Sequence, residues 1–382
     1  MSVEHHLPSP SPVVAVESLA HGGQGVGRVD GRVVFVDGAV PGDVVELANV
    51  QLKGRFSRAG IGGVVNASPD RMVPPCPVFD RCGGCDWQMM TLAAQRRWKA
   101  EIVAGQLAHL GRVEDPPVLD TVAVGPGFGY RNRIDVRVAN GHPALLAARS
   151  HHPVIIPGCP LVTGPVAEIL AEFRPARGVD RATIRASTTT GESVTMRRRG
   201  GRWERGRLHE MVAGHRFQIT GRAFFQVNTA GAEMLVDLVN TSLQVDRTDV
   251  LLDGYAGGGL FSATVGAAAG EVIAVESDPT AQRDLAVNAP GAAMVAQSFE
   301  AGRLPPVDLA VLDPPRAGLG RRGVEVIVAA RPRALCYVSC DPASLARDAA
   351  SLIGAGYRLE QVTPVDMFPQ THHIESVSLF TK

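Results

Sequence analysis

From about residue 216 to residue 382, short apolar runs alternate with helical stretches, and this rhythm limits the possible folds more than any other feature. The apolar runs read VLLDGYA, EVIAVES, AAMVAQS, DLAVLD and ALCYVSC. The stretches between them, such as PTAQRDLAVNA and ASLARDAASLIGAG, are long enough for helices. Strand–helix alternation at this spacing is typical of a parallel, doubly wound sheet. The sequence therefore predicts an α/β domain here.

Residues 13–67 predict a different architecture, a small β-barrel. The segments VVAVESLA, RVVFVDGAV and DVVELANVQLKGRFSRAGI read as short alternating strands separated by turns rich in Gly and Pro. About five such strands fit an OB-like barrel. Residues 1–12 are polar and Pro-rich, and we expect them to be disordered. Residues 68–215 look mixed and antiparallel, with a helix expected over 91–110.

The overall composition limits location and partners. Basic and acidic residues balance at 38 each, so the whole chain has no polyanion-binding signature. Lysine occurs only at Lys53, Lys99 and Lys382, and this arginine bias is explained as well by a GC-rich genome as by phosphate recognition. No apolar run approaches the roughly 18 residues of a membrane span, and the N-terminus lacks a secretory signal pattern. We expect a cytoplasmic protein without a membrane partner, in which cysteines act as ligands, nucleophiles or core residues.

Three cysteines lie within ten residues of one another. Cys76, Cys82 and Cys85 stand as C-x5-C-x2-C, and the two glycines between the last pair let both thiolates turn toward one metal. Cys159, in PGCPL, is the best candidate for a fourth ligand. Four thiolates bind either zinc or an iron–sulfur cluster, and the single short CxxC pair favours the cluster slightly.

A nucleotide-like pocket is predicted where strands of the α/β domain end. VLLDGYAGGGLFS reads as a strand, a glycine turn and a helix, and Glu276 ends the next strand, where a carboxylate can accept hydrogen bonds from ribose hydroxyls. The turn alone fits a dinucleotide or S-adenosylmethionine. Asp313 opens the DPPR sequence of VLDPPRAG, which is similar to a motif of methyltransferases that act on nucleic-acid bases. Taken alone, Asp313 could also be a helix cap or a turn residue, which is the less favoured interpretation.

YVSCDPASLARD places Cys340 between the fifth strand and a helix. A helix N-terminus lowers the pKa of a nearby thiol, so Cys340 is a candidate nucleophile. Cys336, four residues earlier in the apolar strand, is expected to be a core residue.

Several segments together resemble the RNA 5-methyluridine methyltransferase family with an N-terminal TRAM domain. They are HGGQGVGRVDGRVVFVDGAVPGD, CPVFDRCGGCDWQ, GRAFFQVN, LLDGYAGGGLFS, VLDPPRAG, YVSCDPASLARD and DMFPQTHHIESVSLF. The resemblance implies a multidomain fold: a TRAM barrel at 13–67, a central domain with a [4Fe–4S] cluster at 68–215, and a Rossmann-like class I methyltransferase domain at 216–382.

The resemblance also implies roles for individual residues. The cluster ligands would be Cys76, Cys82, Cys85 and Cys159. The residues that bind S-adenosylmethionine would be Gln226, Tyr255, Glu276 and Asp313. Cys340 would be the nucleophile and Glu375 the general base. Many relatives carry Asn after the glycine turn, where this chain has Leu260, so no side-chain contact to the cofactor is expected there.

The implied activity is methyl transfer from S-adenosylmethionine to C5 of a specific uridine in RNA by a monomer. We favour 23S rRNA as the substrate because the barrel and the cysteines resemble the rRNA members of the family. A tRNA T-loop uridine is the alternative, and a non-catalytic RNA-binding factor is a second class, disfavoured by the presence of both Cys340 and Glu375. RRRGGRWERGR at 197–207 surrounds Trp203 with arginines and is either an RNA contact or a solvated hairpin tip.

Overall fold

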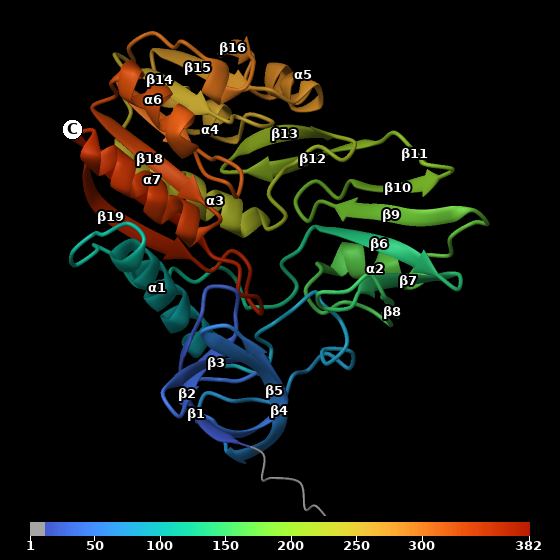
Figure 1. Ribbon diagram of the computed structural model, residues 1–382. Helices are drawn as coiled ribbons and strands as arrows, with labels where there is room; N and C mark the ends of the chain where they lie inside the picture. Colours follow the sequence, from blue (N-terminus) through green and yellow to red (C-terminus); the bar gives the residue numbers. More distant parts are fainter. Residues whose placement is uncertain (1–11) are drawn as a thin grey trace, which may run out of the picture.

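The computed structural model describes residues 12–382, which form three lobes (Figure 1). A barrel lies at one end of the molecule, a central sheet lies to one side, and a larger α/β lobe holds the C-terminus. The segment expected to be disordered, 1–12, falls outside the described residues apart from Pro12. Within residues 12–382, no helix has the length and apolar character required to cross a membrane.

The first lobe is the predicted barrel. Its five strands are β1 (Val13–Leu19), β2 (Gly25–Val29), β3 (Arg32–Val36), β4 (Val44–Lys53) and β5 (Phe56–Asn66). They close in the order β1-β2-β3-β5-β4. Alternate valines, such as Val14, Val16, Val34 and Val36, point inward and form the barrel core.

The second lobe is an antiparallel sheet in the order β11-β10-β9-β6-β7-β8. Its strands are β6 (Arg133–Ala139), β7 (His142–Leu146), β8 (Pro153–Ile155), β9 (Val179–Ala186), β10 (Ser193–Arg199) and β11 (Arg202–Trp203). Ile134, Val136 and Ile184 join one apolar cluster with residues of helix α2 (Gly164–Glu172). Because side chains alternate along a strand, the arginines between these residues face away from α2.

The third lobe is a seven-stranded sheet in the order β16-β15-β14-β17-β18-β20-β19. Its strands are β14 (Val250–Gly254), β15 (Glu271–Glu276), β16 (Ala293–Ala296), β17 (Leu309–Leu312), β18 (Ala334–Ser339), β19 (Arg358–Val365) and β20 (Glu375–Thr381). Its helices are α3 (Thr229–Leu243), α4 (Leu260–Ala263), α5 (Pro279–Asn288), α6 (Gly320–Ala330) and α7 (Pro342–Gly354). The first five strands are parallel, as predicted, whereas β19 and β20 run antiparallel because loop 366–374 joins them without a crossover helix.

Helix α1 (Leu92–His109) of the predicted central domain and a hairpin that spans the domain's predicted C-terminal limit both pack on the third lobe. The helix contacts α7 and β19, and the hairpin of β12 (Arg207–Val212) and β13 (His215–Thr220) contacts α3 and α5. Because these segments contact the third lobe, the contacts do not define a boundary at residue 215, and the domain limits 68–215 and 216–382 stay predictions from the sequence. A fully buried ion pair lies at this joint, with Lys99 Nζ of α1 2.7 Å from Asp366 Oδ1.

Candidate active site

A cavity of about 970 Å³ opens where the parallel strands of the third lobe end. It is lined by all six residues that the sequence predicts for catalysis and cofactor binding: Gln226, Tyr255, Glu276, Asp313, Cys340 and Glu375. Ligands of open α/β sheets bind at this edge, in the crevice where the strand order reverses. The structure thus brings together residues that are up to 149 positions apart in the chain, counted from Gln226 to Glu375.

The glycine turn after β14 forms one wall of the cavity. Gly257 and Gly259 have positive φ angles of 55° and 88°. The Gly257 N–H donates to Glu276 Oε2 at 2.7 Å, so the carboxylate at the tip of β15 fixes the turn. A Cβ on Gly257 would meet no atom within 4 Å and would point into open space. The turn therefore leaves the backbone open to a ligand.

Tyr255 and Leu260 flank this turn. Tyr255 adopts a positive φ of 63°, which is strained for a residue with a side chain, and its hydroxyl donates to Glu300 Oε1 at 2.7 Å. Leu260 is buried in the core of the third lobe and also lines the cavity. The cavity wall is therefore apolar at the position where many members of the resembled family carry Asn.

Asp313 lines the cavity, and the buried Asp253 lies close enough to it to affect its charge. Burial raises the pKa of Asp253 to about 7, and burial together with the nearby charge of Asp253 raises the pKa of Asp313 to about 7. Ser262 donates twice to Asp253 Oδ2, but the buried Asp253 Oδ1 has no hydrogen-bond partner among residues 12–382. A site with this charge is suited to a positively charged ligand.

Cys340 and Glu375 lie side by side because of the sheet register. Ser339, at the end of β18, pairs with Ser376 at the start of the antiparallel β20, so the neighbouring residues Cys340 and Glu375 meet at the same edge. Glu375 is 3% exposed. Burial, and then the charge of Asp313, raises the pKa of Glu375 well above its usual value.

The expectation that a helix N-terminus lowers the pKa of Cys340 is wrong for this structure. Burial, followed by the charges of Glu375 and Asp313, raises that pKa to about 12. The N-terminus of α7 is already capped by Asp341, whose carboxylate accepts from Ser344 N at 2.8 Å. Arg316 acts in the opposite direction and lowers the pKa of Cys340.

Arg316 and His373 are among the polar residues of the cavity that the sequence analysis missed; the others are Arg131, Arg222, Asp278 and Thr280. Arg316 and His373 lie 3.4 Å apart, measured from an Arg316 terminal nitrogen to His373 Nδ1. Burial and the neighbouring His372 and Arg316 lower the pKa of His373 to about 4, so the imidazole is neutral at neutral pH. Both Arg316 and His373 belong to segments on which the family resemblance rests, VLDPPRAG and DMFPQTHHIESVSLF. Their place in these segments could have identified them as candidate site residues.

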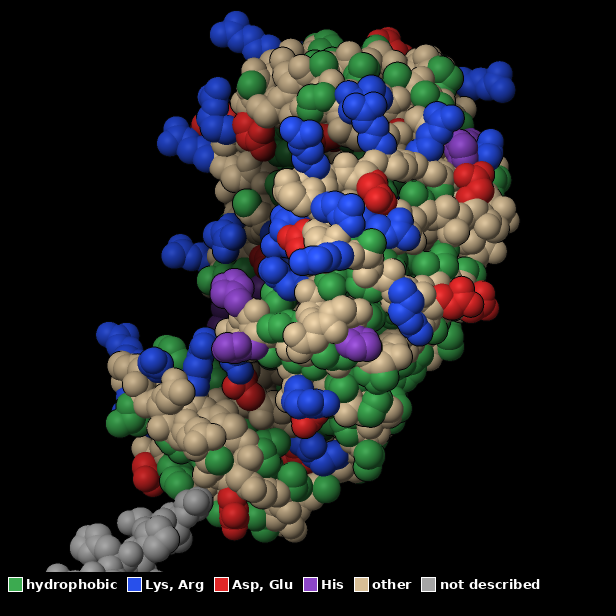
Figure 2. All heavy atoms as spheres, turned by 90° about the vertical axis from the view of Figure 1, so that its right-hand side faces the viewer, with side chains coloured by type: hydrophobic (Ala, Val, Ile, Leu, Met, Phe, Trp, Pro, Cys, Tyr) green, Lys and Arg blue, Asp and Glu red, His purple; other side chains and the backbone are tan. Residues whose placement is uncertain are grey.

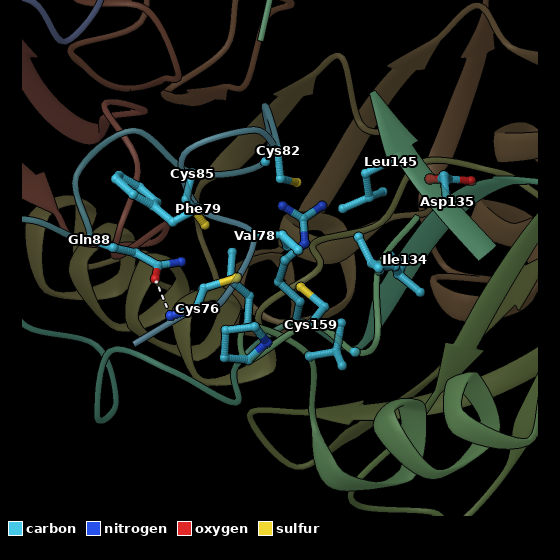
Figure 3. A pocket seen from close by; sticks show the side chains of 17 residues that line it. Cys76, Val78, Phe79, Cys82, Cys85, Gln88, Ile134, Asp135, Leu145 and Cys159 are labelled. Atoms are coloured by element: carbon cyan, nitrogen blue, oxygen red, sulfur yellow. Dashed lines mark hydrogen bonds between the residues drawn. The ribbon is translucent and has the colours of Figure 1, made fainter. Parts of the chain in front are cut away.

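The four predicted metal ligands line a second cavity, of about 210 Å³: Cys76, Cys82, Cys85 and Cys159. Figure 3 shows their sulfur atoms around the same space. Burial raises the pKa of Cys85 to about 12. Across residues 12–382, no three His, Cys, Asp or Glu side chains form a group that could hold a metal ion. The metal assignment therefore stays a prediction.

The cysteine segment contacts the loop that precedes Glu375. The N–H groups of Asp86 and Trp87, which follow Cys85 directly, donate to the Gln370 carbonyl at 3.1 and 3.0 Å. Asp86 Oδ2 also lies 2.6 Å from His372 Nδ1. Any change in the cysteine segment can therefore reach the active site through loop 366–374.

Comparisons with known proteins match both ends of the chain. Residues 13–58 match the TRAM domain, and residues 306–382 match the family described as tRNA (Uracil-5-)-methyltransferase. A protein of Thermosynechococcus vestitus named as an uncharacterized RNA methyltransferase is 33% identical over 96% of this chain and 97% of its own length. A similarly named protein of Streptomyces avermitilis is 32% identical over 96% of this chain and 97% of its own length.

The chain belongs to this RNA (uracil-5-)-methyltransferase family. Among solved structures, the tRNA (uracil-54, C5)-methyltransferase of Pyrococcus abyssi, in complex with S-adenosyl-L-homocysteine, has the same fold. It superimposes with a TM-score of 0.77 over 97% of this chain and 100% of its own, at 22% identity.

An RNA methyltransferase of this family uses S-adenosylmethionine, and the cavity fits that cofactor. The glycine turn leaves open space beside its backbone, and Glu276 lies at the tip of the second strand. The acidic residues that line the cavity, among them Glu276 and Asp313, suit the positive charge of a sulfonium.

Proposed function

We propose that this RNA methyltransferase methylates C5 of uridine through a covalent bond between Cys340 and C6 of the base. The observation that carries this proposal is the pairing of Cys340 with Glu375 in the cavity that also holds the predicted cofactor residues. A non-catalytic RNA-binding factor would have no need of a thiol and a buried carboxyl at this edge.

The thiolate of Cys340 attacks C6, and the electron pair of the C5–C6 double bond moves into an enolate with carbanion character at C5. Bound S-adenosylmethionine supplies an electrophilic methyl group, which C5 accepts. Glu375 then removes the remaining C5 proton, the C5–C6 double bond reforms, and the thiolate of Cys340 leaves. The uridine must leave its stack to present C6 to Cys340, so base flipping is part of the reaction.

The charge balance of the cavity explains how both groups ionise. With a pKa of about 12, Cys340 holds its proton at neutral pH in the ligand-free protein, and the raised pKa of Glu375 favours its protonated form. Positive charge in the cavity lowers the pKa of both groups, and Arg316 already acts in this direction on each of them. We assign the cofactor contacts to Gln226, Tyr255, Glu276 and Asp313, all of which line the same cavity.

We also propose that Cys76, Cys82, Cys85 and Cys159 hold a [4Fe–4S] cluster. The proposal is supported by the cavity that the four cysteines share and by the positively charged Arg131, which lines the same cavity. Burial raises the pKa of Cys159, and the charge of Arg131 acts against this rise. Anaerobically purified protein should be brown and contain about four irons per chain. Stoichiometric zinc without iron would contradict this assignment.

We propose 23S rRNA as the substrate and a monomer as the active form, since one chain supplies every residue of the cavity. A tRNA T-loop uridine is the second candidate, and it is favoured by the name of the Pyrococcus abyssi neighbour. Mass mapping of 5-methyluridine in rRNA and tRNA from a deletion strain tests both. Loss from 23S rRNA alone supports the proposal, loss from tRNA establishes the alternative, and no loss from either refutes uridine methylation.

A further inference from the structure

A row of arginines crosses the face of the central sheet that points away from α2. Arg137 of β6 and Arg181 of β9 stand directly opposite each other in the antiparallel register. Like charges in this arrangement destabilise a sheet. Among the described residues neither arginine has a carboxylate partner, and the buried Arg181 Nε donates to no acceptor. The folded protein therefore keeps an unfavourable repulsion between the two arginines, which a bound anion would offset.

The two arginines line a groove of about 260 Å³ together with Trp203 and Arg222. The Arg222 guanidinium stacks over the Trp203 ring at 4.1 Å from its centroid. One acid, Asp135, also lines the groove, but Arg133 and Thr183 already donate to it. The groove therefore combines unneutralised positive charge with an aromatic ring.

The groove and the active-site cavity share one lining residue. Arg222 lines both, and Phe224, which is 69% exposed, lies on the cavity side of the same turn. Figure 2 shows Lys and Arg side chains gathered on the face of the molecule where the central sheet lies. When a uridine of an RNA strand enters the cavity, the neighbouring nucleotides of that strand would lie close to this groove.

The arginines of the 197–207 hairpin are less available than the sequence suggests. Arg198 pairs with Asp180, and Arg197 pairs with Glu204 at 3.3 Å. Of that segment, Trp203 is the residue that lines the groove.

We infer that this groove binds the single-stranded RNA next to the target uridine: Arg137 and Arg181 contact its phosphates, and the Trp203–Arg222 stack supports a neighbouring base. Arginine forks bind phosphate oxygens, and aromatic rings stack on any base, so the groove suits a single strand without reading its sequence. The inference rests on the proposed function, because the flipped uridine fixes where the strand begins.

The test measures binding without chemistry, in a Cys340→Ala background. The probe is a fluorescent oligouridylate of about 15 nucleotides, titrated at several salt concentrations. Arg137→Ala/Arg181→Ala should weaken binding and flatten the salt slope by about 1.4, since each phosphate contact on a single strand contributes about 0.7. Arg247→Ala, an exposed arginine in the loop before β14, is the matched control and should change neither quantity.

A second readout separates RNA binding from a structural role. Removing the two facing like charges should leave the melting temperature unchanged or raise it, and affinity for S-adenosylhomocysteine should be retained. Trp203→Ala should weaken binding at every salt concentration, and Trp203→Phe should restore part of it. An unchanged salt slope in the double arginine variant, or a large loss of thermal stability, would overturn the inference. Failure of uridine methylation by the wild-type enzyme would refute the proposed function and leave this result standing.

Discussion

The buried pair of Lys99 and Asp366 should be essential for the stability of the loop that leads to Glu375. Both side chains are fully buried, and Lys99 Nζ donates to Asp366 Oδ1 at 2.7 Å and to the Phe368 carbonyl at 3.0 Å. Lys99→Met leaves the Asp366 carboxylate inside the protein with Arg96, 3.2 Å away, as its one remaining partner among residues 12–382. Loss of one member of a buried pair costs about 3–5 kcal/mol, and the remaining contact to Arg96 places the expected loss near the lower value, about 3 kcal/mol.

Urea unfolding of the ligand-free enzyme measures this loss. Lys53→Met, which removes an exposed lysine from the barrel, is the matched control and should shift the free energy of unfolding by less than about 0.5 kcal/mol. The double variant Lys99→Met/Asp366→Asn should be about 1–2 kcal/mol more stable than the sum of the single losses predicts. A loss below about 1 kcal/mol for Lys99→Met, or strictly additive losses, would refute this explanation.

Three further predictions concern the charges and the cysteines. Arg316→Ala removes a cation that lowers the pKa of Cys340. As a result, kcat/KM at neutral pH should fall roughly tenfold, and the rising limb of the pH–rate profile should move to higher pH. A rising limb at the same pH as in the wild type would disprove this role of Arg316. Burial raises the pKa of Asp313 to about 7, so the native state favours its protonated form. The stability of the ligand-free protein should therefore decrease as pH rises from about 4 through 7. The melting temperature of Asp313→Asn should decrease less over this range, and a pH dependence identical to that of the wild type would count against the prediction. Cys85→Ser should lower the iron content and also kcat, because the next two residues donate to the Gln370 carbonyl of the loop before Glu375. Cys336→Ala, which changes a buried core residue, should keep its activity. Loss of activity in Cys336→Ala together with full activity in Cys85→Ser would contradict the assignment of these cysteines.

The fold was predictable where the pattern of apolar residues is local. The five-stranded barrel was predictable from alternating residues, and the parallel strands of the third lobe from short, continuous apolar runs. The helix near 91–110 was also expected, but its buried residues include Gln95 and Lys99, so its sequence did not indicate which face is buried. Cys336, within an apolar strand, is fully buried as expected. The antiparallel β19 and β20 were not predicted, because strand direction depends on a connection rather than on periodicity.

The placement of the site residues was predictable only through motifs, and their electrostatics were not predictable at all. The pKa of Cys340 depends on Glu375 and Arg316, which other strands bring to the same edge of the sheet. The facing pair of Arg137 and Arg181 likewise depends on the register of two strands that are far apart in the sequence. The link from Asp86 to His372 joins segments that are 286 residues apart.

In the proposed mechanism, Cys340 forms the covalent bond to uridine and Glu375 removes the C5 proton that allows this bond to break. The most direct measurement is mass spectrometry of the denatured enzyme after reaction with substrate RNA and S-adenosylmethionine, followed by peptide mapping of the adduct. Glu375→Gln keeps the thiol but cannot remove the C5 proton, so it should accumulate a methylated RNA adduct on Cys340; the wild-type enzyme should do the same with 5-fluorouridine RNA. Cys340→Ala should form no adduct and no 5-methyluridine. An adduct in Cys340→Ala, or one that maps to Cys336, would contradict the proposed mechanism.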